Sequence, residues 1–84
     1  MAPRRLEFSD AFAVVLEKHR RAKKLSRQAL ADKAGIHQTC VGMFERGLSD
    51  PSLDAANAIA EALELPLSKL IAKAEALRRR AESV

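Results

Sequence analysis

The chain contains no tryptophan or tyrosine, three phenylalanines and a single cysteine among its 84 residues. One cysteine cannot form an internal disulfide, so no internal disulfide cross-links this chain. No apolar run approaches the length of a signal peptide or of a membrane-spanning helix, and we therefore expect a cytoplasmic protein. Internal repeats, low-complexity linkers and β-rich patterning are also missing, which predicts a single helical domain over residues 1–84.

The groups that support catalysis are missing as well. The sequence has no nucleophile flanked by a histidine and an orienting carboxylate, no phosphate-binding glycine loop and no pair of acids placed for general acid and base chemistry. Its two histidines and its cysteine do not show the recurring spacing of zinc ligands. His19 and Cys40 fall on inward helix faces, where packing roles are expected. The sequence thus predicts no enzyme, no metal and no cofactor.

Hydrophobic residues make up 48% of the chain, while aromatic residues make up only 4%. This composition is typical of a helix bundle packed with alanine and leucine. The formal net charge of +4 and the isoelectric point near 9.7 favour a polyanionic partner. A basic domain without such a partner would have the same balance of charges.

Apolar residues recur at helical spacing in five segments, which predicts an all-α fold with its core at about residues 8–73. Ser9 or Asp10 is expected to cap the first helix, which ends near residue 23. The other expected helices cover 27–34, 38–46, a segment after the Ser52 cap, and 66–80. The fourth helix is expected to bury Leu53, Ala56, Ile59, Ala60 and Leu63.

Residues 26–47 have the spacing of a helix-turn-helix. Ser26 is a good N-cap, and Gly35 falls where the chain needs a left-handed residue to leave the helix. The second helix of the motif is expected to bury Val41 and Phe44, with small Ala31 allowing a close crossing. Its outward face carries Gln38, Thr39, Gly42, Met43 and Arg46. A short helix held out in this way can enter the major groove of DNA, which is roughly 12 Å wide.

Three segments form an ordered set, namely residues 27–36 (RQALADKAGI), 44–47 (FERG) and 51–53 (PSL). This set resembles the phage-repressor/Cro family of bacterial regulators, also called the xenobiotic-response-element family. The resemblance covers roughly residues 10–73. It implies a compact five-helix, lambda-repressor-like DNA-binding domain with its helix-turn-helix at the second and third helices, and a regulator that binds double-stranded DNA.

The resemblance also implies particular contacts. Gln38 and Thr39 would meet base edges, because a Gln amide can pair with adenine and Thr offers a hydroxyl or a methyl group. Met43 would meet a thymine methyl or simply be an exposed apolar residue. At Gly42 the family usually has a side chain. The glycine either lets the helix approach the bases more closely or loosens the helix.

Other residues are expected to hold the backbone of DNA or the motif itself. The candidates for phosphate contacts are Arg27, Gln28, His37 and Arg46. His37 would alternatively cap the recognition helix, and Arg46 would complement the helix dipole. The structural residues of the motif are expected to be Ala31, Gly35, Val41, Arg20 and Glu45. The resemblance implies that Arg20 pairs with Glu45 and ties the motif to the first helix.

The last helix carries an apolar stripe, which predicts a homodimer. The stripe consists of Leu67, Leu70, Ile71, Ala74 and Leu77. Two copies would read half-sites of a palindromic operator about 34 Å apart and block RNA polymerase, or less often recruit it. Alternatively, the stripe packs entirely within one chain. The competing functions are an antitoxin of the same fold and a protein-interaction module that no longer reads DNA.

Overall fold

The computed structural model describes residues 7–82, and these residues form helices without any strand. The elements are α1 (Phe8–Ala22), α2 (Arg27–Ala34), α3 (Gln38–Glu45), α4 (Leu53–Ala62) and α5 (Leu67–Glu82). The prediction of an all-α fold with five helices is confirmed. Both expected ends of α2 and the expected starts of α3 and α4 match the observed ones, and the other expected ends lie within three residues.

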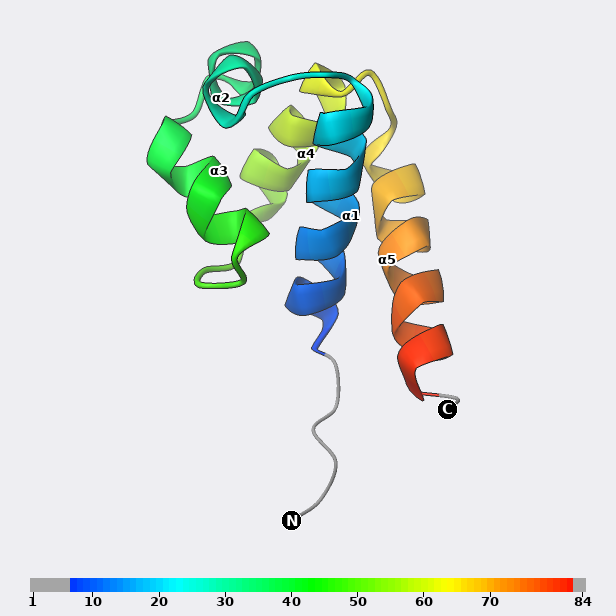
Figure 1. The fold of residues 1–84 in the computed structure, drawn as a ribbon. Helices are drawn as coiled ribbons and strands as arrows, with labels where there is room; N and C mark the ends of the chain where they lie inside the picture. Colours follow the sequence, from blue (N-terminus) through cyan, green and yellow to red (C-terminus); the bar gives the residue numbers. More distant parts are fainter. Residues whose placement is uncertain (1–6, 83–84) are drawn as a thin grey trace.

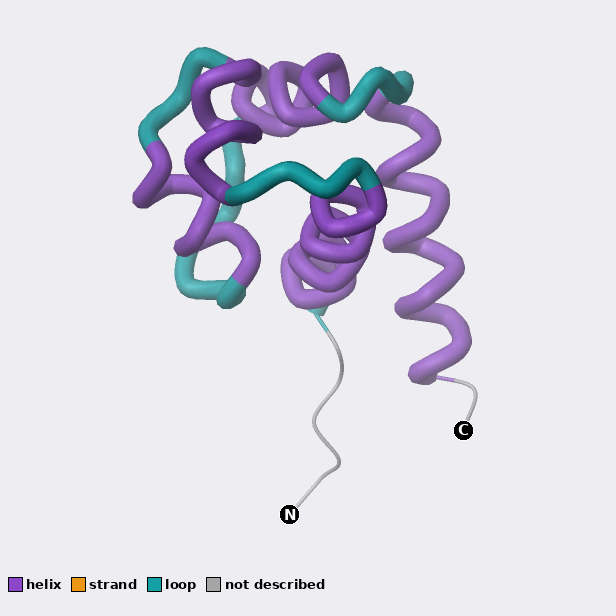
Figure 2. Tube along the Cα trace, turned by 45° about the horizontal axis from the view of Figure 1, so that its top comes forward, coloured by secondary structure: helices purple, strands orange, loops and turns teal. Residues whose placement is uncertain are grey.

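Helix α1 lies at the centre of the fold, with α3 and α5 on its opposite sides (Figures 1 and 2). It packs against both of these helices, and more extensively against α5. Helix α2 packs on α3 and α4, and α4 in turn contacts α5. This arrangement leaves the outer side of α3 uncovered by any other helix of the described residues.

The core is built from leucine and isoleucine separated by small residues. The largest fully buried side chains are Leu16, Leu30, Val41, Ile59, Leu63 and Leu70. Alanines such as Ala31 and Ala60 are also almost inaccessible, which lets neighbouring helices approach closely. Burying a leucine or isoleucine side chain stabilises a fold by about 1.5–3 kcal/mol. Residues from α1 through α5 all contribute to this one cluster.

The start of α1 differs from the expectation. The helix begins at Phe8 with Glu7 as its N-cap, rather than after Ser9 or Asp10. Asp10 instead lies in the first turn, where its carboxylate accepts a hydrogen bond of 3.3 Å from the backbone N–H of Glu7. An acidic side chain in the first turn also complements the helix dipole. Asp10 therefore supports the helix start from inside the helix.

Leu53 was expected in the core, and this is wrong, because 80% of its surface is exposed. It is the first residue of α4, directly after Ser52, whose hydroxyl caps the helix by accepting the N–H of Ala55 at 3.0 Å. The apolar stripe of α4 therefore extends beyond the core. Leu53 lies at the rim of a hollow of about 380 Å³, whose apolar lining includes Phe8, Phe12 and Ile71.

The apolar stripe of α5 divides between two roles. Leu70 and Ala74 are fully buried within the single chain, so they have no surface to offer a second copy. This corrects the expectation that both lie in a dimer interface. Leu67, Ile71 and Leu77 are only partly buried at the edge of the core. Packing against α1 and α4 thus takes up the central residues of the stripe and leaves its flanks accessible.

Candidate nucleic-acid interface

The turn between α2 and α3 forms as its residues dictate. The hydroxyl of Ser26 accepts the N–H of Ala29 at 3.0 Å and so satisfies a free donor of the first turn. Gly35 ends α2 with φ of 72°, a left-handed conformation that glycine adopts without steric cost. The N–H of Ile36 then bonds to the carbonyl of Ala31 at 3.0 Å. These contacts set the angle at which α3 leaves the body of the protein.

His37 caps the recognition helix α3. Its Nδ1 accepts the backbone N–H of Thr39 at 3.1 Å. Of the two roles expected for this residue, the structure shows the capping role. The cap uses the lone pair of Nδ1, so only the other ring nitrogen is available for a phosphate.

The residues of α3 point into the core or outward largely as predicted. Val41 is fully buried, and Phe44 packs at the edge of the core. Gln38 and Thr39 are exposed at the start of the helix, next to exposed His37. Met43 is half-buried, which leaves part of its thioether side chain accessible one turn further on. The first turn of α3 therefore presents an amide and a hydroxyl to the outside.

A buried ion pair ties α3 to α1, as the resemblance implied. Arg20 and Glu45 form two hydrogen bonds, from Nε to Oε2 at 2.6 Å and from Nη2 to Oε1 at 3.1 Å. The remaining Nη1 of Arg20 donates to the carbonyl of Leu25 at 2.8 Å. Side-chain exposure is 9% for Arg20 and 0% for Glu45. The hydrogen bonds to Glu45 raise the pKa of the Arg20 guanidinium, so it stays charged.

Arg27 joins the same carboxylate, which was not predicted. Its Nε lies 3.1 Å from Oε1 of Glu45. One carboxylate thus connects α1, α2 and α3 through two arginines. Arg27 keeps 41% of its side chain exposed, so part of its guanidinium still faces outward. Arg27 therefore supports the motif through Glu45, and its contact with phosphate stays a prediction.

Gly42 was expected on the outward face of α3, but it is buried, because two guanidinium groups lie over it. Arg46 folds back so that its Nε donates to the carbonyl of Gly42 at 3.2 Å. A Cβ added at Gly42 would lie 3.7 Å from Nη2 of Arg46 and 4.0 Å from Nη1 of Arg27. These are ordinary van der Waals distances, so packing within the chain does not require a glycine here. The arginines form a cationic border along the outer side of α3.

We expect Gly42→Ala to stabilise the fold. Alanine has room at this position and is favoured over glycine inside a helix by about 0.5–1 kcal/mol. Thermal unfolding followed by circular dichroism checks this, and a lower melting temperature would contradict it. If the glycine permits close approach to bases, the same variant will bind DNA more weakly despite its higher stability.

Three other residues considered in the sequence analysis are Gln28, Cys40 and His19. Gln28 is exposed on the first turn of α2, and Cys40 is partly buried beside Val41. His19 is half-buried, with its Nδ1 bonded to the carbonyl of Val15 at 2.9 Å. Among residues 7–82 no group of three or more histidines, cysteines or acids is placed to hold a metal ion.

Comparisons with known proteins agree with this geometry. A chain from a protein described as an HTH_3 family transcriptional regulator from Vibrio cholerae is 32% identical, with a TM-score of 0.73, and covers 77% of this chain and 36% of that one. The clp gene regulator ClgR from Corynebacterium glutamicum shares the fold at 16% identity, with a TM-score of 0.88 and coverage of 95% and 85%. No curated protein matches the chain significantly.

A further solved structure has a higher sequence identity to this chain than these two. The restriction-modification controller protein C.AhdI from Aeromonas hydrophila is 34% identical, with a TM-score of 0.72, and the match covers 74% of this chain and 94% of that one. The family model HTH_3, described as helix-turn-helix, matches residues 16–70, which is more than half of the chain. This match includes the capped turn, α3 and the Arg20–Glu45 pair, and the chain belongs to the HTH_3 family of helix-turn-helix proteins.

Proposed function

We propose that this protein regulates transcription by binding DNA with α3 in the major groove. The observation that carries the proposal is the exposed start of α3, where Gln38 and Thr39 stand free of the core beside a cationic border. Family membership supports it, as do the regulators and the controller protein among the similar structures. A protein with this function works at the nucleoid, in the cytoplasm of a bacterial cell.

Different residues would supply specificity and affinity. The amide of Gln38 can donate to N7 and accept from N6 of adenine, while Thr39 offers a hydroxyl or its methyl group to a neighbouring base. Met43 adds an apolar contact for a thymine methyl. Arg27, Gln28 and Arg46 would contact phosphates, and phosphate contacts fix position rather than sequence preference. The Arg20–Glu45 pair holds these groups in place without touching DNA.

A second copy would complete the binding unit, since one short helix contacts few bases. The hollow beside Ile71 and exposed Leu53 is a suitable surface for the homodimer, because its lining is mainly apolar and Leu53 protrudes at its rim. Ile71 of the predicted stripe lines this hollow, and Leu67, one turn earlier on α5, is also partly accessible. A twofold dimer would read a palindrome with half-sites about 34 Å apart. Its occupancy of an operator would block RNA polymerase, which makes repression the favoured outcome.

Replacing Leu53 with lysine is expected to dissociate this dimer without unfolding the chain. Leu53 is 80% exposed, so its loss costs the isolated monomer little, whereas a charge buried in a subunit interface is strongly unfavourable. Sedimentation equilibrium should show a shift from dimer to monomer. Leu48→Lys is the matched control, because Leu48 is 64% exposed and does not line the hollow. Equal effects of both substitutions would exclude this surface.

The proposed function is tested by selecting bound sequences from a random duplex library with the purified protein. We expect an enriched palindrome, and a log–log dependence of affinity on salt with about −0.9 per phosphate contact. Two arginine contacts per subunit would give a slope of about −3.6 for a dimer. No enrichment, with weak binding insensitive to Gln38→Ala and Thr39→Ala, would overturn the proposal and favour a protein-interaction module.

No helix in the described residues is long and apolar enough to cross a bilayer.

A further inference from the structure

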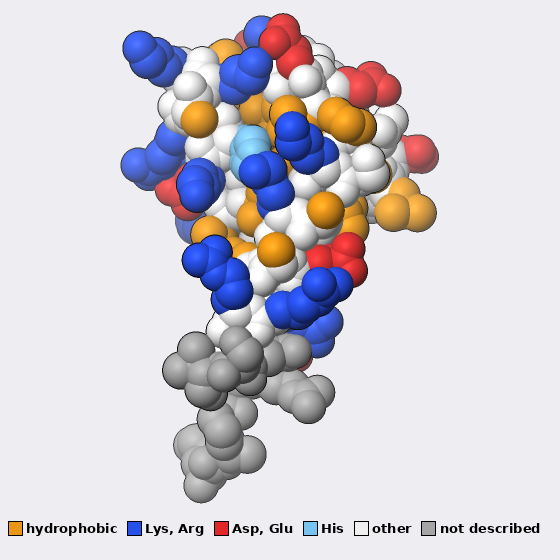
Figure 3. Space-filling view, turned by 90° about the vertical axis from the view of Figure 1, so that its right-hand side faces the viewer, with side chains coloured by type: hydrophobic (Ala, Val, Ile, Leu, Met, Phe, Trp, Pro, Cys, Tyr) orange, Lys and Arg blue, Asp and Glu red, His pale blue; other side chains and the backbone are white. Residues whose placement is uncertain are grey.

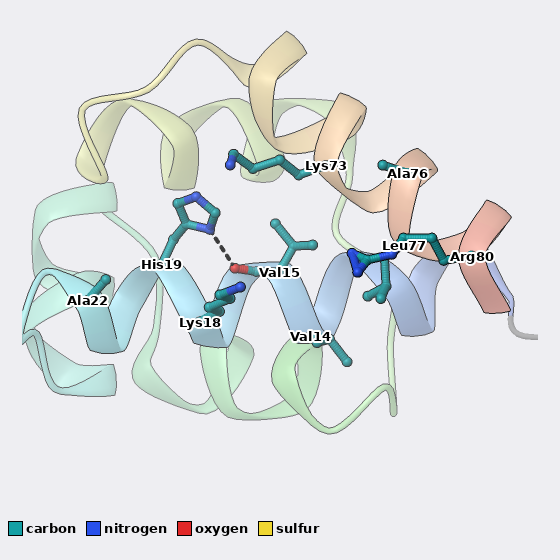
Figure 4. Close-up of a pocket in the computed structure, with 9 residues that line it drawn as sticks. All are labelled: Val14, Val15, Lys18, His19, Ala22, Lys73, Ala76, Leu77 and Arg80. Atoms are coloured by element: carbon teal, nitrogen blue, oxygen red, sulfur yellow. Dashed lines mark hydrogen bonds between the residues drawn. The ribbon is translucent and has the colours of Figure 1, made fainter.

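A hollow of about 410 Å³ lies between α1 and α5, away from the recognition helix. Its floor is apolar, and Figure 4 shows the side chains that line it. The apolar members are Val14, Val15, Ala22, Ala76 and Leu77. Val14 is 53% exposed although it belongs to the otherwise well-packed α1. The hollow therefore offers apolar surface that packing within the chain leaves uncovered.

Positive charge borders this apolar floor. Lys18 on α1 faces Lys73 and Arg80 on α5 across the hollow, and no carboxylate lines it (Figure 4). Lys18 and Lys73 form no ion pair with any residue of the described chain. On this face Lys and Arg side chains surround apolar groups, while Asp and Glu lie mainly at the top and the sides of the view, with one acidic side chain beside Lys and Arg lower on the face (Figure 3). The local field favours a negatively charged ligand.

DNA held by α3 does not account for this surface. Helix α1 separates α3 from α5, and the hollow faces the side of the molecule opposite α3 (Figures 1 and 3). A second copy of the chain does not account for it either. Twofold packing about an axis through the hollow would bring Lys18, Lys73 and Arg80 of one subunit close to the same cations of the other, and like charges in close contact are unfavourable.

We propose that this groove binds an acidic amphipathic helix of a partner protein. An apolar side chain of that helix would enter the hollow above Leu77 and Val15, as in other helix-in-groove complexes. Asp or Glu residues flanking it would pair with Lys18 and Lys73. His19 contributes a fixed polar group, because the bond from its Nδ1 to the Val15 carbonyl orients the ring. The groove would allow a regulator bound to DNA to recruit a partner at the same time.

The proposal is tested with the ¹⁵N-labelled 84-residue chain and a synthetic probe peptide. The probe is an acetylated three-heptad helix with leucine on one face and glutamate on both sides of it. We expect chemical-shift changes that concentrate at Val14, Lys18 and Ala76 and spare α3. The proposal does not depend on DNA binding, and shifts at the groove would support it even if α3 reads no sequence.

Three variants distinguish binding in the groove from attraction by the net charge of the protein. Lys18→Glu with Lys73→Glu should weaken peptide binding at least about tenfold, since it replaces two attractions by two repulsions. Lys24→Glu with Lys33→Glu changes the net charge equally, but both lysines lie outside the groove, so its effect should be less than about twofold. Ala76→Phe fills the hollow from an exposed position and should weaken binding without any change of charge.

Several results would overturn the proposal. Equal weakening by both lysine pairs would mean attraction by net charge alone. Shifts at the groove caused by duplex DNA rather than by the peptide would indicate a phosphate-binding face. Shifts that grow with protein concentration alone would indicate a second copy. The absence of any shift at millimolar peptide, with the fold intact by circular dichroism, would exclude the acidic helix as the occupant.

Discussion

Arg20→Ala is expected to destabilise the protein by about 3–5 kcal/mol, the largest effect of any single substitution considered for its stability. The carboxylate of Glu45 has no exposed surface and accepts two hydrogen bonds from Arg20. Removing Arg20 leaves that charge buried with only Arg27 as a partner, and it also orphans the carbonyl of Leu25. Small proteins are stable by about 5–15 kcal/mol, so much of that stability would be lost. Urea denaturation measures the change.

Two controls distinguish this mechanism from a general loss of charge. Arg21→Ala removes a neighbouring arginine that is 70% exposed and pairs with Glu17 one turn earlier, so it should cost less than about 1 kcal/mol. Arg20→Met combined with Glu45→Leu removes both buried charges and should recover most of the stability. DNA binding by Arg20→Ala should follow the folded fraction. Binding lost at unchanged stability would show that Arg20 contacts DNA directly.

Local rules explain why much of the fold could be predicted. Ser26 and Ser52 cap helices because a hydroxyl before an apolar helix has few better partners than the free N–H groups of the first turn. Gly35 takes the left-handed conformation for an equally local reason. The failure at Leu53 shows the limit. Helical periodicity assigns it to the inward face, but whether another element covers that face depends on tertiary packing.

The contacts that sequence spacing could not predict join distant residues. Arg27 and Glu45 are separated by 18 positions, and nothing in either segment indicates that one carboxylate binds two arginines. The same pattern holds for α5, where Leu70 and Ile71 are neighbours in one apolar stripe. Only the placement of α1 and α4 decides that the first is fully buried and the second accessible at the edge.

The candidate site was located by its motif, while the geometry around Gly42 required the structure. The sequence allowed either a loosened helix or a close approach at this position. In the structure α3 continues through Gly42, and two arginines cover the backbone there. A loosened helix is therefore not needed to explain the glycine.

Gln38→Ala with Thr39→Ala is expected to abolish most discrimination between the selected operator and random DNA. A good bidentate base contact contributes about 1–3 kcal/mol of discrimination, so the loss at Gln38 alone corresponds to roughly 5- to 150-fold. Both side chains are exposed and outside the core, so the melting temperature should change little. Fluorescence anisotropy with the operator and with a scrambled duplex measures the ratio of the two affinities.

Arg27→Ala and Arg46→Ala should produce the opposite pattern. Loss of a phosphate contact weakens binding to both duplexes by a similar factor and lowers the salt slope by about 0.9 for each contact removed. Arg46 is the cleaner test, because its Nε donates a hydrogen bond to the carbonyl of Gly42, whereas Arg27 also supports Glu45. If Arg46→Ala changes the operator preference and leaves the salt slope unaltered, Arg46 reads a base, and the guanidinium over Gly42 belongs to recognition rather than to anchoring.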